Sequence, residues 1–301
     1  MFDRLTLQED LVDCRGAVIA PRGAVISPET IQEAAEGAPQ HPRARLSETH
    51  LARDLEEPLA SSVYAPLFGR AGAREAVERT VLAVELPEPL VEELLDLRAA
   101  RPELYRHAVM TTAVAVRILR TAAGSSRTLT ELAAAALLHD LGMRQIPARL
   151  LANRDRLSLE QVHRIAAHPL LGAYHLASVL GHHPAVAAAR SHHWRCGQGY
   201  PGLSGAPARS IEVISIASAF CALTQPRPYR SSPYDARGAV DVLVRETVTG
   251  HADPTTVRLL VHALRGGDGN PVGVRFGGSR SGHVPQVNGH VPVAPPARSP
   301  V

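Results

Sequence analysis

Hydrophobic residues recur every three or four positions through most of the segment from about residue 72 to 264, which is the spacing of amphipathic helices. Polar cap residues and prolines divide this segment into separate helices. One helix is predicted over about 102–122, closing at Gly124, and the next from the capping box Thr128-x-x-Glu131 to Gly142. The other expected helix starts are Ser158-x-x-Gln161, Pro169, Pro184 and Pro254. The pattern therefore predicts a mainly α domain.

The first 36 residues follow a shorter, strand-like alternation. Leu11-Val12 and residues 17–19 flank a turn at 13–16, and a second turn leads into residues 24–26. Ser27-Pro28 then offers an N-cap followed by proline at the first helical position. Residues 1–36 are therefore expected to form a small β-hairpin module that runs into a helix.

Composition sets the remaining boundaries. Residues 37–71 are polar and contain prolines, so they are predicted to be a linker with short helices. Residues 72–265 are expected to form the helical domain. From residue 266 to 301 the chain is rich in Gly, Pro, Ser and Val without a helical or strand period, which predicts a disordered tail.

Charge and cysteine content narrow the possible functions. The chain has 301 residues, of which 45% are hydrophobic, enough for a substantial core. Its 32 basic residues, all arginine, are interleaved with 29 acidic ones, and the net charge is only +3. This pattern argues against nucleic-acid binding but allows a small anionic ligand. Because no residue is lysine, a single arginine carries little functional information.

No segment is predicted to cross or enter a membrane. The N-terminus lacks the apolar core of a signal peptide, and the longest apolar run, Leu132 to Leu138, is far too short to span a bilayer. Cys14, Cys196 and Cys221 are few, odd in number and far apart, which favours a reducing compartment over a disulfide framework. We therefore expect a cytoplasmic protein.

The adjacent pair His139-Asp140 is the most informative chemical feature. Both residues end an otherwise apolar helix, where a buried imidazole and carboxylate cost several kcal/mol unless a partner such as a divalent metal compensates them. Any one histidine is as easily a cap or a surface residue, but the set favours a metal site: His107, His139, His168, His192 and His193.

Two of these positions carry further detail. His192 and His193 project about 100° apart on a helix, which suits two metals side by side, although a polar helix terminus is the alternative. Glu103 precedes His107 by one helical turn, so both can face one point. The alternative for Glu103 is a solvated carboxylate in the first turn.

The chain resembles the HD-GYP branch of the HD-domain metal-dependent phosphohydrolases over most of residues 100–245. The motifs that carry this resemblance, in family order, are His139-Asp140-Leu141-Gly142, Ile146-Pro147, His168-Pro169-x-x-Gly172-Ala173, Gly199-Tyr200-Pro201-Gly202-Leu203, Ala222-Leu223-Thr224 and Arg227-Pro228-Tyr229-Arg230. Residues 11–31 also resemble the small module that often precedes such domains.

The resemblance implies an all-helical domain with two or three metal ions, usually iron or manganese, that hydrolyses the bacterial second messenger cyclic di-GMP. It implies that His107, His139, Asp140, His168, His192 and His193 are metal ligands. Asp140 would bridge two ions, and Asp140 and His139 would form the catalytic pair. Glu103 matches a ligand for a third ion. Tyr200 would line the ligand pocket, and Arg227 and Arg230 match positions that grip phosphates, unless they form a solvated face.

Four positions depart from the family pattern. Met143 stands where the family has a lysine, and the segment after the histidine pair is shortened to Trp194-Arg195-Cys196-Gly197. Ser218 and Cys221 stand where the family has aspartates. Cys221 could supply a thiolate and favour zinc, or be a small core residue. Asp235 or Glu212 could instead supply the missing carboxylate.

Three hypotheses follow. The first is a metal-dependent phosphodiesterase acting on cyclic di-GMP or a related nucleotide, that is, on a small phosphodiester, in bacterial signalling. The second is a degenerate relative that binds metal or nucleotide as a regulatory or protein-interaction module, with a signalling protein or a second copy as partner. The third is a helical scaffold without metal. The first two predict that the ligand candidates converge, with Ser218 facing them.

Overall fold

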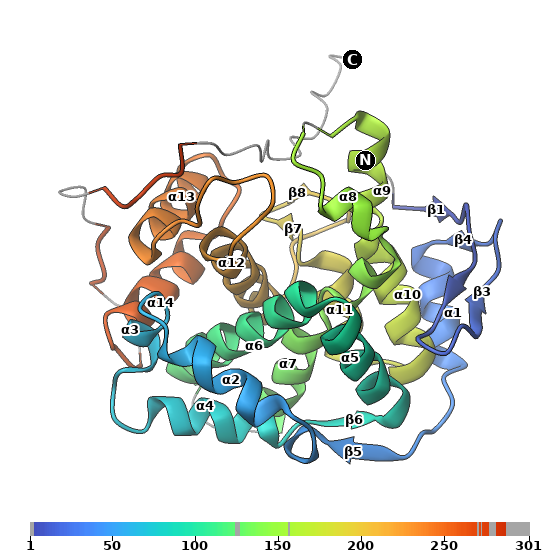
Figure 1. The fold of residues 1–301 in the computed structure, drawn as a ribbon, viewed down its shortest axis with the longest axis horizontal. Helices are drawn as coiled ribbons and strands as arrows, with labels where there is room; N and C mark the ends of the chain where they lie inside the picture. Colours follow the sequence, from blue (N-terminus) through green and yellow to red (C-terminus); the bar gives the residue numbers. More distant parts are fainter. Residues whose placement is uncertain are drawn as a thin grey trace.

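The computed structural model describes residues 3–123, 127–155, 157–269, 271, 273–276 and 281–286. Its centre is two long helices, α6 (Pro102–Ala123) and α12 (Arg209–Thr224), which pack against each other (Figure 1). α12 buries apolar residues around almost its whole circumference, as expected for a helix enclosed by others. α6 also packs on α7 (Arg127–Leu138), and α7 on α11 (Pro184–Ser191).

Further helices complete the bundle around this centre. α10 (His168–Leu180) packs on α11, and α5 (Glu88–Ala100) and α4 (Ala73–Leu82) pack on α6. α13 (Ala236–Val248) and α14 (Pro254–Leu264) pack on α12. The remaining elements of this region are η2 (Leu141–Gln145), α8 (Ala148–Leu151), α9 (Leu159–Ala166) and the hairpin of β7 (Trp194–Arg195) with β8 (Gln198–Gly199). The predicted mainly α helical bundle is confirmed.

Most predicted helix starts are confirmed. Ser158 caps α9 as a capping box: the Gln161 amide donates to Ser158 Oγ (3.2 Å), and the Ser158 amide donates to Gln161 Oε1 (2.9 Å). α11 and α14 begin at Pro184 and Pro254, and Pro169 is the second residue of α10.

The boundaries of α7 were predicted wrongly. Thr128 lies inside α7 instead of capping it, and α7 ends at Leu138, not at Gly142. Gly142 lies in the 3-10 turn η2, where a Cβ would come within 2.1 Å of the His168 carbonyl oxygen. The chain leaves the helix early because this turn must pass close to α10. Gly124 lies outside the described residues.

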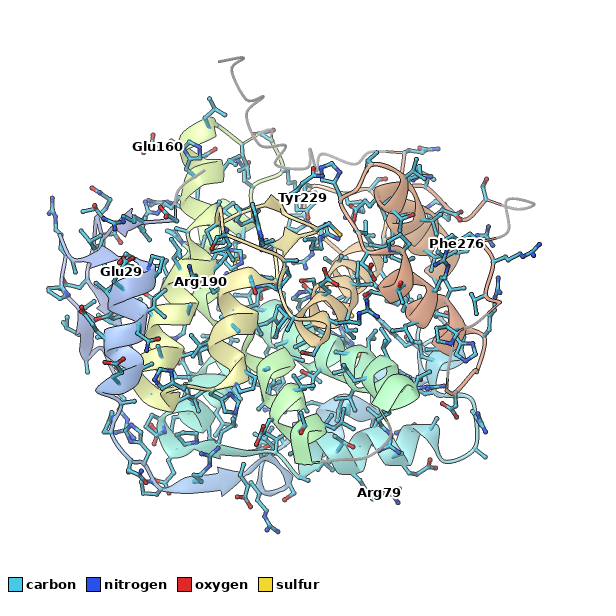
Figure 2. All side chains as sticks on the ribbon, turned by 180° about the vertical axis from the view of Figure 1, so that it is seen from behind. Glu29, Arg79, Glu160, Arg190, Tyr229 and Phe276 are labelled. Carbon is cyan, nitrogen blue, oxygen red and sulfur yellow. The ribbon has the colours of Figure 1, made fainter. Side chains whose placement is uncertain are left out.

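The N-terminal module (residues 3–36) has the predicted form. β1 (Leu5–Thr6) pairs with β4 (Val25–Ile26), and β2 (Leu11–Val12) with β3 (Val18–Ala20), all antiparallel. Ser27 caps α1 (Pro28–Glu36), which packs on α10. Glu29 of this module and Arg190 of α11, both labelled in Figure 2, lie on the same side of the molecule, and the charge of Glu29 acts on the Arg190 guanidinium.

Residues 37–71 are more than a linker. The segment contains β5 (Arg43–Arg45), paired with β6 (Glu85–Pro87), and the short helices η1 (Leu46–Glu48), α2 (Leu51–Ala60) and α3 (Ala65–Phe68). Leu51, Leu55 and Leu59 point one side of α2 into the core. Burial of these leucines makes the segment part of the bundle, which polar composition alone did not reveal.

The described residues of the predicted disordered tail also contact the bundle. The buried Arg117 guanidinium donates to the Gly267 carbonyl oxygen (2.8 Å) and to Asp268 Oδ1 (2.7 Å). The Phe276 ring, labelled in Figure 2, lies under the Arg258 guanidinium at 5.7 Å. In the described ranges, no helix has the length and apolarity needed to cross a bilayer.

A buried carboxylate joins the N-terminal module to the bundle. Glu93 of α5 is 1% exposed, and its Oε1 accepts a hydrogen bond from the Cys14 amide (2.9 Å). Its Oε2 lies 3.2 Å from Arg144 Nε, and His175 Nε2 lies 3.6 Å from Oε1. Burial raises the pKa of Glu93 to about 7, although Arg144 and the Cys14 amide lower it. The folded protein therefore favours the protonated carboxyl group.

We expect Glu93→Gln to flatten the pH dependence of stability. The folded pKa of about 7 exceeds the usual 4.5, so the Glu93 contribution to the free energy of unfolding is full below pH 4.5 and is lost as pH rises through 7. Denaturant unfolding at pH 5 and pH 8 measures this loss. Wild type should lose roughly 2 kcal/mol more than Glu93→Gln. The control is Glu88→Gln, an exposed glutamate of the same helix, which should behave as wild type. Equal losses in wild type and Glu93→Gln would contradict the assignment.

Candidate metal centre

Four helix ends or faces bring the histidine candidates to one place. His107 lies within α6, His139 and Asp140 directly follow α7, and His168 opens α10. His192 and His193 directly follow α11. The apolar residues of α7 and α11 pack into the core. The first residue after each helix, His139 and His192, is therefore also buried.

The structure gathers the six predicted ligands into two groups. In each group the nitrogen or oxygen donors lie within 4.8 Å of one another. We call them the His168 half (His168, His192, His193) and the His107 half (His107, His139, Asp140). The rings of His139 and His192, one from each half, are 4.9 Å apart, so the halves adjoin.

Backbone carbonyls fix the orientation of three imidazoles. His139 Nδ1 donates to the Ala136 oxygen (2.8 Å), and His168 Nδ1 to the Ile165 oxygen (2.7 Å). His192 Nδ1 lies 3.0 Å from the Ala189 oxygen. A carbonyl oxygen can only accept a hydrogen bond, so each Nδ1 carries the proton. Each Nε2 therefore faces the centre, which is the usual orientation of a metal-binding histidine.

Asp140 lies between the two halves. Its Oδ1 is 3.1 Å from His168 Nε2 and 3.6 Å from His192 Nε2, while its Oδ2 is 3.8 Å from His107 Nε2. Oδ1 is buried and has no hydrogen-bond partner. Burial alone would raise the pKa of Asp140, but the neighbouring histidines lower it well below the usual value. The carboxylate is therefore ionised and has one oxygen on each side of the centre.

These donors fit divalent metal ions. Burial lowers the pKa of His107 to about 4 and that of His139 to about 3, so both rings are neutral at pH 7. His168 Nε2 and His192 Nε2 lie only 3.2 Å apart, and Asp140 Oδ1 lies 3.1 Å from the first and 3.6 Å from the second. A cation among these three atoms would be coordinated by both rings and would satisfy the carboxylate.

Ser218 faces the centre, as predicted. Its Oγ lies 3.2 Å from both His107 Nε2 and His139 Nε2. A hydroxyl has one proton, so it can donate to only one of these rings at a time. Ser218 therefore occupies the His107 half as a neutral group with no negative charge to offer.

The other candidate replacements for the missing carboxylate lie elsewhere. Asp235 caps α13, where its Oδ1 accepts from the Gly238 amide (2.6 Å). Glu212 lies in the first turn of α12, beside Asp253 and Arg209. Cys221 is fully buried, and burial raises its pKa to about 12, so it behaves as a core thiol beside Thr111 and Tyr64.

Two other predicted site residues have partners elsewhere. Glu103 is 55% exposed, pairs with Arg101 (2.9 Å) and is not among the grouped donors. The Arg230 guanidinium donates to the carbonyl oxygens of Ala222 (3.1 Å) and Leu223 (2.7 Å) and lies over the Tyr234 ring. Arg230 thus holds the end of α12, because buried carbonyls there need a donor.

Tyr200 contacts the cluster, and Arg227 acts on it through its charge. The Tyr200 ring stacks on the His193 ring with centroids 4.5 Å apart and an interplanar angle of 19°. The Arg227 charge helps burial to lower the pKa of His107, and Arg227 Nε is buried without a hydrogen-bond partner. Arg227 is therefore a cation whose charge reaches the His107 half and whose buried Nε has no acceptor.

Gln225 is a site residue that the sequence did not reveal. It follows the last residue of α12, and its Oε1 lies 3.2 Å from His107 Nδ1. The imidazole N–H donates to this oxygen, which directs His107 Nε2 to the centre. Gln225 lies between the Ala222-Leu223-Thr224 and Arg227-Pro228-Tyr229-Arg230 motifs, and that position was the available signal of a site residue. A glutamine at a helix end, however, usually faces solvent.

Comparisons with known proteins agree with this geometry. The HD domain family model matches residues 89–256. The chain is 34% identical over 131 residues to 3'3'-cGAMP-specific phosphodiesterase 1 of Vibrio cholerae, covering 42% of this chain and 30% of that protein. It is 28% identical over 181 residues to cyclic di-GMP phosphodiesterase PA4108 of Pseudomonas aeruginosa, covering 57% of this chain and 42% of that protein. The chain thus matches less than half the length of each relative.

One solved structure is similar in outline. Bd1817, an HDG"Y"P protein from Bdellovibrio bacteriovorus, superposes with a TM-score of 0.47 and 17% sequence identity. The superposition covers 79% of this chain and 77% of Bd1817.

We expect manganese to stabilise the protein through this cluster. An ion that binds only the folded state at 100 times its dissociation constant adds about 2.7 kcal/mol, which raises Tm by several degrees. His168→Ala should lose most of that rise, because it removes a donor next to Asp140. His182→Ala, which changes an exposed histidine, is the control and should keep it. Thermal melts with manganese and with EDTA measure the effect, and an equal rise in both variants would contradict the assignment.

Proposed function

The chain belongs to the HD-domain family, in which Gly199-Tyr200-Pro201 marks the HD-GYP type, and on that premise we propose that it is a metal-dependent phosphodiesterase. Its proposed substrate is cyclic di-GMP or a related cyclic dinucleotide. The observation that carries the proposal is the convergence of the His168 and His192 Nε2 atoms on Asp140 Oδ1, which is buried and has no hydrogen-bond partner. Both curated relatives bear the names of cyclic-dinucleotide phosphodiesterases.

The donor set suits ions that accept nitrogen and carboxylate ligands, and we propose iron or manganese, with zinc as the alternative. Divalent ions held there would activate water at neutral pH and offset the negative charge of the phosphodiester. His107, His139, His168, His192 and His193 would hold two such ions. Asp140 would bridge them, because its oxygens face opposite halves.

Two neighbouring side chains would bind the nucleotide. Arg227 would donate to the phosphate, since its buried Nε lacks a partner and a guanidinium makes charge-assisted hydrogen bonds to phosphate oxygens. Tyr200 would form an aromatic wall next to His193, against which a ring of the substrate can pack. Arg230 has no such role, because backbone carbonyls and the Tyr234 ring occupy its guanidinium.

Ser218 and Met143 favour a second candidate function. Ser218 stands where the HD-GYP pattern has a carboxylate, so the His107 half lacks that charge. Met143 stands where the pattern has a lysine after His139-Asp140. The alternative is therefore a regulatory module that binds metal and nucleotide without turnover, with a signalling protein or a second copy as partner.

We expect Asp140→Ala to separate the two functions. In a phosphodiesterase this change should reduce hydrolysis of cyclic di-GMP to background, because the bridging carboxylate is lost, while nucleotide binding persists through Arg227. Chromatography of the products and calorimetric titration measure the two properties. If metal-loaded wild type binds the nucleotide and releases no product, the regulatory module is the correct function. Absence of binding under anaerobic, metal-replete conditions would contradict both.

Arg227→Ala should weaken nucleotide binding whichever function holds. Loss of a charge-assisted hydrogen bond costs about 1.5 to 3 kcal/mol, roughly a 10- to 100-fold increase in Kd. Arg79→Ala is the matched control, because Arg79 is exposed and lies at the far end of the molecule from Tyr229 (Figure 2). Equal affinities in the two variants would show that Arg227 does not contact the ligand.

A further inference from the structure

The two halves of the centre offer unequal donors. The His168 half has three imidazoles and the closer Asp140 oxygen, Oδ1, at 3.1 and 3.6 Å from two of them. The His107 half has two imidazoles, Oδ2 at 3.8 Å from His107, and the neutral hydroxyl of Ser218. Among the described metal-binding groups, Asp140 is the single carboxylate. The single negative charge of Asp140 must therefore compensate divalent ions in both halves.

The shortage of negative charge is concentrated in the His107 half. Ser218 Oγ lies 3.2 Å from both His107 and His139, so it fills the position from which a carboxylate would reach an ion there. Arg227, two residues after the Gln225 that binds His107, adds positive charge that acts on this half. An ion in this half is repelled by the guanidinium and compensated only by the shared carboxylate.

Two buried donors near this half also lack partners. Arg227 Nε and Gln225 Nε2 have no hydrogen-bond partner, and Gln225 is fixed in place because its Oε1 accepts from His107. Unpaired buried donors are costly, more so when charged. An anion beside His107 would satisfy the donors and supply the negative ligand that Ser218 does not.

We propose that the His168 half binds one ion tightly by itself, whereas the His107 half binds its ion together with an anion, a phosphate oxygen of the ligand. The nature of that ligand rests on the proposed function. The unequal binding of the two ions rests only on the donors of this chain.

This arrangement makes metal binding and anion binding cooperative. If phosphate raises the affinity for the second ion by some factor, the second ion must raise the affinity for phosphate by the same factor. An aspartate at position 218 would supply the negative charge from the protein. This aspartate would therefore raise the affinity for the second ion and make that affinity largely independent of phosphate.

Equilibrium dialysis of the full chain against manganese, with and without inorganic phosphate at matched ionic strength, tests the proposal. Wild type should bind one ion tightly and a second weakly. Phosphate should raise the affinity for the second ion by about tenfold or more. Ser218→Asp should bind two ions without phosphate, whereas Ser218→Ala should resemble wild type. Arg227→Met should keep the tight ion and lose most of the phosphate effect.

Two equally tight ions in wild type without phosphate, or a second ion that phosphate does not affect, would overturn the proposal. The wild-type arms decide this even if a variant fails to fold, which circular dichroism would show. The dialysis involves no nucleotide and no turnover. Failure of the proposed function, seen as no binding or hydrolysis of cyclic di-GMP, is therefore distinguishable from failure of this inference.

Discussion

The Asp140 carboxylate, whose Oδ1 is buried among the imidazoles of four helices, dictates how the surrounding elements are arranged. An unpaired buried charge is costly, and Oδ1 has no hydrogen-bond donor to offset that cost. The Ala136 and Ile165 carbonyl oxygens accept hydrogen bonds from the Nδ1 atoms of His139 and His168, which turns each Nε2 toward the centre. These nitrogens and Oδ1 together form a set of donors that could hold a cation, and a cation there would offset the carboxylate charge.

The fold around this cluster is built to hold it at fixed geometry. η2 follows Asp140 directly and passes so close to α10 that Gly142 contacts the His168 carbonyl and Gly172. The N-terminal module reaches the same turn, since the Val12 carbonyl accepts hydrogen bonds from Arg144 Nη1 (3.2 Å) and Gln145 Nε2 (2.7 Å). The N-terminal module thus supports the segment that follows His139-Asp140. Removal of the module should therefore disturb the metal centre.

The sequence predicted the parts of this protein that rest on local rules. The capping box at Ser158, the strands of the module and the inward-facing Ser218 follow from spacing and burial. Residues whose partners lie far away in sequence were missed or misplaced. Arg230 was predicted to bind phosphate, but its Nη1 donates to the carbonyl oxygens of Ala222 and Leu223 in α12. Those oxygens accept a side-chain donor because α12 ends at Thr224, and the sequence did not indicate that end. Gln225 was missed because its partner, His107, is 118 residues away.

Anomalous X-ray diffraction from crystals grown with manganese would show whether an ion binds at Asp140. We expect a strong anomalous peak within bonding distance, about 2 Å, of Asp140 Oδ1, His168 Nε2 and His192 Nε2. A second peak should lie in the His107 half, near His139 Nε2, when phosphate is present. Metal-replete crystals with no peak among these atoms, and with protons or waters joining the imidazoles to Asp140 instead, would contradict the account.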